Sequence, residues 1–481
     1  MRSFIFAFAF VASAVVGCQT EPTADPYDPF VPDTTDDGTE HINNDGTEHI
    51  SGYEPEVCDP AEVDVYDPNQ VISYELDIDE QTLEMLDAVG YSWAWGETYD
   101  QLSYYAESIT VDAPGCQTIV FEQPRVEMGR QMGYQSPYTE GSWIVEYNQV
   151  NNDQVLGEYD DARYWAPTYD GPVAEMWMYN WSMDYIDHMP HRDMAWMRMR
   201  TTWWGNQEAI YNSLEPVKDD FAKRNGMVAL WEGTDLWQYP GNGGDCEYGD
   251  CSAIGDRVEE CAGMLGGVGD MNNLIPETGA CYDWDEISAV LAWQDWFSHW
   301  DGCGSNNCYQ YYSGDADNPY SWKQGLVISG VDLLLNELYT SAEDTNFAWT
   351  GGSFGWACKS DKSPGGCREM YVNYLLALSE LARSGQMQMD LYEVHNLRVF
   401  LDIALDGDED WLDQAVDWVS TRPDYVDIGI ETLDTACDYW GDTGYVPCDT
   451  GLWDTGLYGD SGDDSGRIDS GTDSGSLDSG R

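Results

Sequence analysis

Positive charge is scarce in this chain and is nearly missing from its first quarter. The 481 residues include 20 Lys and Arg against 89 Asp and Glu, which gives a formal net charge of -69 at pH 7. No Lys or Arg occurs between Arg2 and Arg125, and the first Lys is Lys218. Such a chain repels the phosphates of nucleic acids and of anionic lipids. Nucleic-acid binding is therefore excluded. The acidic composition is interpreted as a solvated surface that resists aggregation, and adaptation to a saline habitat or divalent-cation binding is the alternative.

Long apolar runs are also lacking, apart from a short one near the N-terminus. Arg2 precedes an apolar segment, residues 4–16, that is too short to span a bilayer permanently and leads into Gly17 and Cys18. This pattern is typical of a bacterial lipoprotein signal peptide, and an ordinary signal peptide with an incidental cysteine is the alternative. We expect residues 1–17 to be removed and a lipid on Cys18 to tether an exported protein to the cell envelope, at the outer membrane or cell surface.

Cysteine usage agrees with an exported protein. Removing Cys18 from the 13 cysteines leaves twelve, an even number suited to disulfides in an oxidising compartment. No His stands beside them at zinc-ligand spacing, which favours disulfides over a zinc site. The spacing leaves the full connectivity open, but four close pairs are predicted to staple local loops: Cys246 with Cys251, Cys303 with Cys308, Cys358 with Cys367, and Cys437 with Cys448.

The two ends of the chain differ in composition from its middle. Residues 18–68 are rich in Asp, Pro, Thr and Gly, and residues 436–481 repeat Asp-Ser-Gly. Neither segment can bury enough apolar area to offset the entropy lost on ordering. We therefore predict a disordered acidic tether, a folded domain over residues 69–435, and a disordered acidic tail.

Hydrophobic periodicity predicts strands first and helices later in the domain. Residues 72–78 alternate as a strand, and a helix that Asp79 caps and Gly90 ends should follow. Further predicted elements are a hairpin of residues 194–202 and 208–214, a helix starting at Pro216, and helices over 285–300, 370–383 (ended by Gly385) and 408–419 (ended by Pro423). The plan is α+β, strand-rich to about residue 232 and helix-rich to about 435.

Polar residues with a suggestive order follow the predicted helix 285–300. Asp301-Gly302 comes first, then Asn307 before a strand-like segment, then Asp332 after an apolar one. Phosphoryl transfer needs one carboxylate to orient the acceptor hydroxyl, and an amide oxygen with a second carboxylate to hold a divalent metal. Asp301, Asn307 and Asp332 could fill these roles, although Asp-Gly turns also occur in ordinary loops.

These motifs resemble the spore-coat protein H (CotH) family of atypical, protein-kinase-like secreted proteins. The likeness covers about residues 70–435 and rests on several short motifs: Trp300-Asp301-Gly302, Asn307-Cys308-Tyr309-Gln310-Tyr311, Gly330-Val331-Asp332, Glu215 with Asp219-Asp220-Phe221, and Arg422-Pro423. The resemblance implies a two-lobed kinase-type fold that uses ATP and Mg²⁺ to phosphorylate hydroxyls of an envelope or coat protein. It assigns catalysis to Asp301 and metal binding to Asn307 and Asp332.

On the nucleotide side the resemblance points to Arg130, Ser136 and Glu215. The family's Arg-x-Lys-Gly-x-x-Ser strand is matched by residues 130–136, but Met132 stands at the Lys position. Arginines such as Arg130, Arg125 or Arg163 would have to meet the phosphates, and a guanidinium is not equivalent to an ammonium. Two functions follow: a protein kinase, placed first because its metal and acceptor residues are present, and a catalytically silent surface binding or adhesion module.

Overall fold

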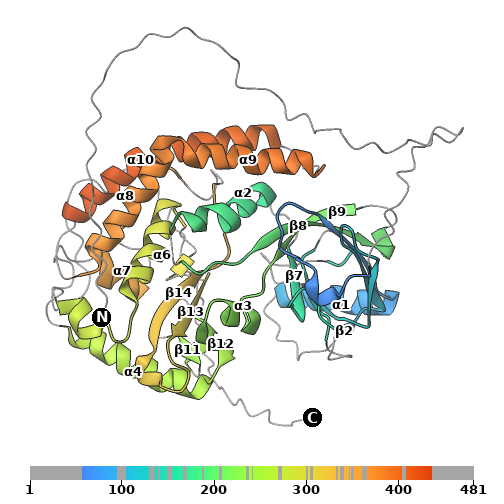
Figure 1. Cartoon of the computed structure of the whole chain (residues 1–481), viewed down its shortest axis with the longest axis horizontal. Coiled ribbons are helices and arrows are strands. Elements are labelled where there is room, and N and C mark those ends of the chain that lie inside the picture. Colours follow the sequence, from blue (N-terminus) through green and yellow to red (C-terminus); the bar gives the residue numbers. More distant parts are fainter. Residues whose placement is uncertain are drawn as a thin grey trace, which may run out of the picture. The chain divides into compact units, whose positions relative to one another are not determined.

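Two β-sheets and ten α-helices make up the part of the chain that the computed structural model describes (Figure 1). All of that part belongs to one unit, residues 55–481. The described residues are 57–94, 104–128, 136–138, 141–148, 154–165, 171–186, 189–204, 208–233, 238–240, 242–268, 273–299, 302–303, 307–331, 334–335, 341–345, 347, 352–359, 366–403 and 408–435. The predicted signal peptide with Cys18, most of the predicted tether and the predicted tail lie outside them.

The larger sheet has nine strands in the order β2-β5-β6-β7-β9-β8-β1-β3-β4. Its strand pairs are antiparallel except that β1 runs parallel to β8. The strands are β1 (Ile72–Asp77), β2 (Tyr104–Tyr105), β3 (Ser108–Asp112), β4 (Ile119–Glu122), β5 (Arg125–Met128), β6 (Trp143–Glu146), β7 (Asp161–Trp165), β8 (Met194–Thr201) and β9 (Glu208–Leu214).

The predicted first strand and the predicted hairpin are confirmed. β1 buries every second side chain, as the alternation of its residues predicts. β8 and β9 pair antiparallel, with Met197 opposite Tyr211. Four predicted helix boundaries were wrong, two of them in the first half of the domain. The helix after β1, α1 (Glu80–Ala94), continues past Gly90, because a glycine inside a helix costs only about 1 kcal/mol relative to alanine.

The second corrected boundary lies after β9. Here α3 (Asp219–Arg224) starts three residues later than Pro216. The carbonyl of Pro216 accepts a hydrogen bond from Lys218 N in a tight turn, and Val217 between them is buried. Asp219 and Asp220 then occupy the first helical turn, where carboxylates are stabilised by the helix dipole.

The smaller sheet has five strands in the order β11-β12-β10-β13-β14. They are β10 (Met227–Glu232), β11 (Tyr239–Pro240), β12 (Gly243–Gly249), β13 (Cys308–Ser313) and β14 (Lys323–Ile328). The edge of β14 is covered by residues that lead into α6 (Trp284–Trp296): Gln324 N donates to Cys281 O, and Asp283 N donates to Gln324 O. This sheet therefore begins where the predicted strand-rich half ends and extends into the helix-rich half.

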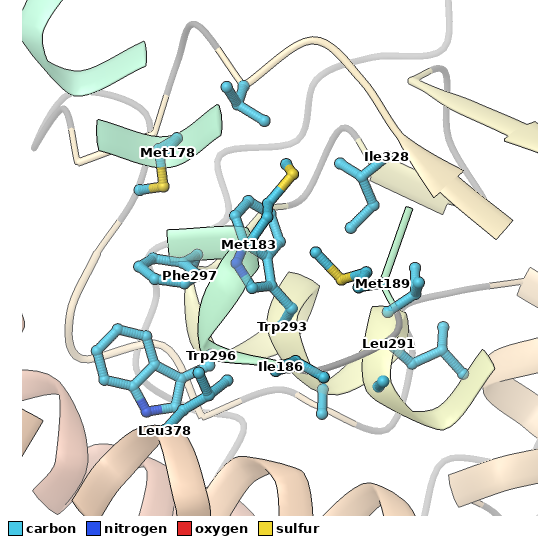
Figure 2. Close-up of a cluster of buried hydrophobic side chains, with 14 of the residues drawn as sticks. Met178, Met183, Ile186, Met189, Leu291, Trp293, Trp296, Phe297, Ile328 and Leu378 are labelled. Carbon is cyan, nitrogen blue, oxygen red and sulfur yellow. The ribbon is translucent and has the colours of Figure 1, made fainter. Parts of the chain in front are cut away.

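The remaining helices pack around α6, whose side chains are buried on nearly all sides. Figure 2 shows part of this core, in which Met183, Trp293 and Ile328 come from three distant parts of the chain. The helices are α2 (Gly171–Trp177), α4 (Cys251–Gly267), α5 (Leu274–Thr278), α7 (Gly352–Lys359), α8 (Arg368–Ser384), α9 (Gln386–Phe400) and α10 (Asp408–Thr435). None of the helices in the described part is both long and apolar enough to cross a membrane.

Gly385 ends α8 in a left-handed conformation, φ +84°, as predicted. The predicted end of α6 was wrong, because α6 stops at Trp296 and Ser298 has a positive φ of 54°. The predicted stop before Pro423 was also wrong, since α10 runs through it to Thr435. Buried contacts explain both results. Arg422 donates to Trp296 O and Asp295 O at 2.6 and 2.5 Å, which caps α6 and anchors α10 immediately before its proline.

Disulfides confirm the predicted oxidised cysteines. Two of the predicted loop staples are present, Cys303–Cys308 and Cys358–Cys367, and two longer links join Cys58 to Cys116 and Cys261 to Cys281. Cys246 is also disulfide-bonded. The predicted pair Cys437 and Cys448 lies outside the described residues.

Candidate functional site

The predicted site residues fall into two groups. Asn307, Ser136 and Glu215 are described, whereas Asp301, Asp332, Arg130 and Cys18 lie outside the described residues. Gly302 and Val331, which adjoin Asp301 and Asp332, are described, and so are His299 and Leu334 two positions away on the other sides, so the structure shows how the nearby chain is held.

Asn307 lies at one end of the β13–β14 hairpin. Its carbonyl accepts a hydrogen bond from Ser329 N at 3.2 Å, next to the paired residues Cys308 and Ile328. Its side chain lies against Gly330, which has φ +65°; a Cβ at that position would come within 2.3 Å of Asn307 Cγ. Only glycine fits both the conformation and the contact. Asn307, one predicted metal ligand, is thus packed against Gly330, which lies two positions before Asp332, the other predicted ligand.

The segment before Asp301 is tied to the same hairpin end. His299 is buried, and its Nε2 lies 3.3 Å from Ser329 O. Burial lowers the pKa of His299 to about 4, so the imidazole is neutral at pH 7. On the other side of Asp301, a Cβ on Gly302 would come within 2.6 Å of Gln294 Oε1. The Cys303–Cys308 disulfide then returns the chain to β13, so the segments carrying the three predicted residues converge.

Cations from the larger sheet reach the same hairpin at Tyr309. Arg163 of β7 donates a hydrogen bond to the Tyr309 side chain. Tyr309 stands opposite Glu232 of β10 and two residues after Asn307, on the same side of its strand. Burial raises the pKa of the Tyr309 hydroxyl, while Arg163 and Arg192 oppose the shift because both guanidinium groups lie close to it.

Arg192 is the more deeply buried of these two arginines. It is 4% exposed, its Nε donates to Glu215 O at 2.7 Å, and it lies over the Tyr179 ring at 5.6 Å. Among the described residues, its Nη2 has no hydrogen-bond partner. Sequence reasoning did not single out Arg192, because nothing in its local sequence shows that its charge acts on Tyr309, more than 100 residues away.

Glu215, predicted to bind the nucleotide, is a buried hydrogen-bond centre. Its carboxylate accepts from Tyr159 Oη at 2.9 Å, from Asp193 N at 3.2 Å and from Arg224 Nε at 3.1 Å. Arg224 Nη2 also pairs with it. Burial raises the pKa of Glu215, and Arg224 opposes that shift. Every described contact of the Glu215 carboxylate is with another residue of the chain, so these contacts give it a structural role.

Ser136 lies elsewhere, beside α1. Its hydroxyl donates to Asp87 Oδ1 at 2.5 Å and accepts from Tyr138 N at 3.3 Å. The described contacts thus place Ser136 with α1 and Asn307 with the smaller sheet.

The first two lysines of the chain are neutralised by aspartates. Lys218 pairs with Asp161 of β7, and Lys223 pairs with Asp219 and Asp220 of α3. Side-chain oxygens of Asp160, Asp219 and Asp220 lie within 4.8 Å of one another, close enough for a cation. The sequence hides this group, because Asp160 is far from the other two along the chain.

Comparison of the chain with protein-family models and with curated proteins finds no match.

Proposed function

We propose that this protein is a CotH-like phosphotransferase with a two-lobed kinase-type domain, which transfers phosphate from ATP to a protein hydroxyl with the aid of Mg²⁺. The observation that carries the proposal is the packing of Asn307 against Gly330 at the end of the β13–β14 hairpin. This contact joins the segment that carries Asp332 to the segment that follows Asp301. These are the three residues that the motif order selects for the chemistry.

The donor set suits the proposed metal. The amide oxygen of Asn307 and the carboxylate of Asp332 are hard oxygen ligands, which Mg²⁺ prefers over nitrogen or sulfur. When bound, the metal would neutralise charge on the transferred phosphate. In the reaction the acceptor oxygen forms a bond to the γ-phosphorus, the bond to the β-phosphate oxygen breaks, and Asp301 accepts the proton of the acceptor hydroxyl.

The arginines near Tyr309 would supply the missing positive charge. Arg163 of β7 and Arg192, two residues before β8, both act electrostatically on the Tyr309 phenol, and Tyr309 is two residues from Asn307. Guanidinium groups bind phosphate oxygens through paired N–H donors. We propose them as the groups that meet the nucleotide phosphates in place of the family's lysines.

A second candidate, the catalytically silent surface binding module, is favoured by the state of the polar residues around α3. Lys218 and Lys223 are paired with aspartates, and the Glu215 carboxylate is saturated with hydrogen bonds. A nucleotide-binding role for these residues would require their pairs to break. The silent module predicts that Mg²⁺-ATP leaves the thermal stability unchanged.

Either function is proposed to operate at the cell envelope. A lipid on Cys18 would hold the folded part near the outer membrane or at the cell surface, and the substrate or partner would be another envelope or coat protein. Labelling of the expressed protein with a radioactive fatty acid, compared between parent and Cys18→Ser, tests this placement. Label that persists in the variant would contradict it.

The activity is tested by phosphate transfer from γ-labelled ATP to the chain itself and to a mixed protein substrate. Asp301→Asn and Asp332→Asn should each reduce transfer at least about 100-fold, because each removes a carboxylate that acts only in the reaction. The matched control is Asp317→Asn, the same change at an exposed position, which should leave transfer unchanged. Full transfer by Asp332→Asn would contradict the proposal.

A further inference from the structure

Helix α9 has two apolar faces, one buried in the core and one whose side chains are exposed. Met387, Leu391 and Val394 are fully buried in the main core. On another side of the same helix, Met389 is 58% exposed, Tyr392 46%, Val399 59% and Phe400 82%. Single exposed apolar residues are ordinary on a protein surface, but a row of them along one helix marks a candidate contact surface.

The helix that carries this row is firmly held. Tyr185 Oη donates to Asp390 Oδ2 at 2.5 Å, and Gln388 Nε2 donates to Ser420 Oγ of α10 at 3.1 Å. At the C-terminal end, Arg198 of β8 donates to Leu401 O at 3.1 Å. Figure 1 shows α9 beside α10. The exposed side chains therefore belong to an anchored helix.

The spacing of the row is that of a helix–helix contact. Met389, Tyr392, Asn396 and Val399 follow one another at intervals of three, four and three residues, which are the a and d positions of a heptad. Among the exposed residues of α9 (386, 389, 392, 393, 396, 399 and 400), Glu393 alone carries a charge. The chain has a net charge of -69. Because the seam itself carries little charge, another acidic protein could approach it there with less repulsion than elsewhere.

We propose that the α9 seam (Met389, Tyr392, Asn396, Val399 and Phe400) binds a second copy of this chain, with the two α9 helices antiparallel about a two-fold axis. Antiparallel pairing sets each a position against a d position. Met389 then meets Val399 of the second copy, and Tyr392 meets Asn396, whose amide can hydrogen-bond the phenol. The two pairings, Met389 with Val399 and Tyr392 with Asn396, are compatible with a single register of the two helices. Each pairing occurs twice, once on either side of the axis, so the seam is self-complementary, as a two-fold contact requires.

The size of the seam predicts a weak dimer. The exposed parts of its side chains amount to roughly 500 Å² per copy. Two copies would bury about 1,000 Å² in total, near the lower limit for a specific contact. A lipid bilayer is the less favoured occupant, because interfacial helices depend on basic polar faces and gain nothing from heptad spacing or a central Asn. The inference is independent of the proposed activity.

The test is sedimentation equilibrium of the full chain carrying Cys18→Ser, which removes the expected lipid, in about 0.5 M NaCl to screen the net charge. A monomer–dimer equilibrium with Kd on the order of 10–100 µM is expected. Val399→Glu should raise Kd at least about tenfold. The control is Val120→Glu, at a valine of β4 that is 50% exposed, which should leave Kd unchanged. Glu393→Gln should lower Kd, because the two Glu393 residues flank the axis.

A charge swap tests the register. Met389→Lys alone and Val399→Glu alone should each weaken the dimer, whereas the double variant should restore it because every Lys then faces a Glu of the other copy. A monomer at all concentrations, a dimer that ignores Val399→Glu, or a double variant no better than the singles would each overturn the proposal. The proposal would also be overturned if the monomer bound lipid vesicles and Val399→Glu abolished that binding, because the seam would then be a membrane contact.

Discussion

The two sheets use their polar residues in different ways. In and around the larger sheet, charged groups neutralise one another: Arg125 pairs with Glu146 at 2.7 Å, and Glu215 pairs with Arg224. At the hairpin end of the smaller sheet, uncharged groups are packed in contact, with Asn307 against Gly330 and neutral His299 against Ser329. An anion could bind at these two pairs only if they rearranged. The hairpin end is organised before any ligand arrives.

The largest expected effect comes from crowding the hairpin end. Gly330→Ala should lower the free energy of unfolding by about 3–5 kcal/mol, because the new Cβ would overlap Asn307 Cγ in a left-handed conformation. Gly226→Ala is the matched control: it has the same φ of +65° but nothing within 4 Å, so it should cost only about 1 kcal/mol. Urea denaturation measures both variants. Equal costs would show that Asn307 does not confine Gly330.

The next effect concerns the ion pairs of the larger sheet. Glu215→Ala should destabilise the protein by about 2–3 kcal/mol, because Arg224 and the Tyr159 hydroxyl lose a buried acceptor while the partly exposed Arg224 can still be solvated. If Glu215 instead bound nucleotide in a strained pocket, its removal would leave stability unchanged or raise it. Thermal and urea unfolding of the variant distinguish these results.

Two buried groups predict opposite dependences on pH. Burial raises the pKa of Glu286 to about 8, so the folded state holds its proton and stability falls as pH rises from about 4.5 to 8. Burial lowers the pKa of His299 to about 4, so stability is lost as pH falls from about 6.5 to 4.

Glu286→Gln should remove the loss on the alkaline side and leave the acid side unchanged. His299→Gln should flatten only the acid side. Urea denaturation of both variants at pH 4.5, 6 and 8 measures the two effects. A single variant that flattens both sides would contradict this assignment.

The smallest effect is expected at the surface. Lys223→Ala breaks its pairs with Asp219 and Asp220, but the lysine side chain is 54% exposed. Exposed ion pairs contribute little, so the loss should stay below about 0.5 kcal/mol. A loss of several kcal/mol would show that the pairs around α3 are structurally essential.

Some local patterns in the sequence predicted local structure correctly. The alternation of β1 and the turn at Gly385 involve only neighbouring residues, and both predictions were confirmed. The predicted stop before Pro423 failed because Arg422 is held by carbonyls of residues about 80 and 127 positions away. The contact of Asn307 with Gly330 follows from neighbouring motifs on one hairpin. The convergence of Arg163 and Arg192 on Tyr309 depends on packing between two sheets, which no short motif encodes.

The most direct test of the proposed function is thermal unfolding of the full chain with and without Mg²⁺-ATP, for the parent and for Asp332→Asn. A ligand that binds only the folded state must raise the midpoint. The proposed site predicts that saturating Mg²⁺-ATP raises the Tm of the parent by several degrees, and that Asp332→Asn abolishes the shift. An unchanged Tm in the parent, or an equal shift in the variant, would contradict a metal-nucleotide site at Asn307 and Asp332.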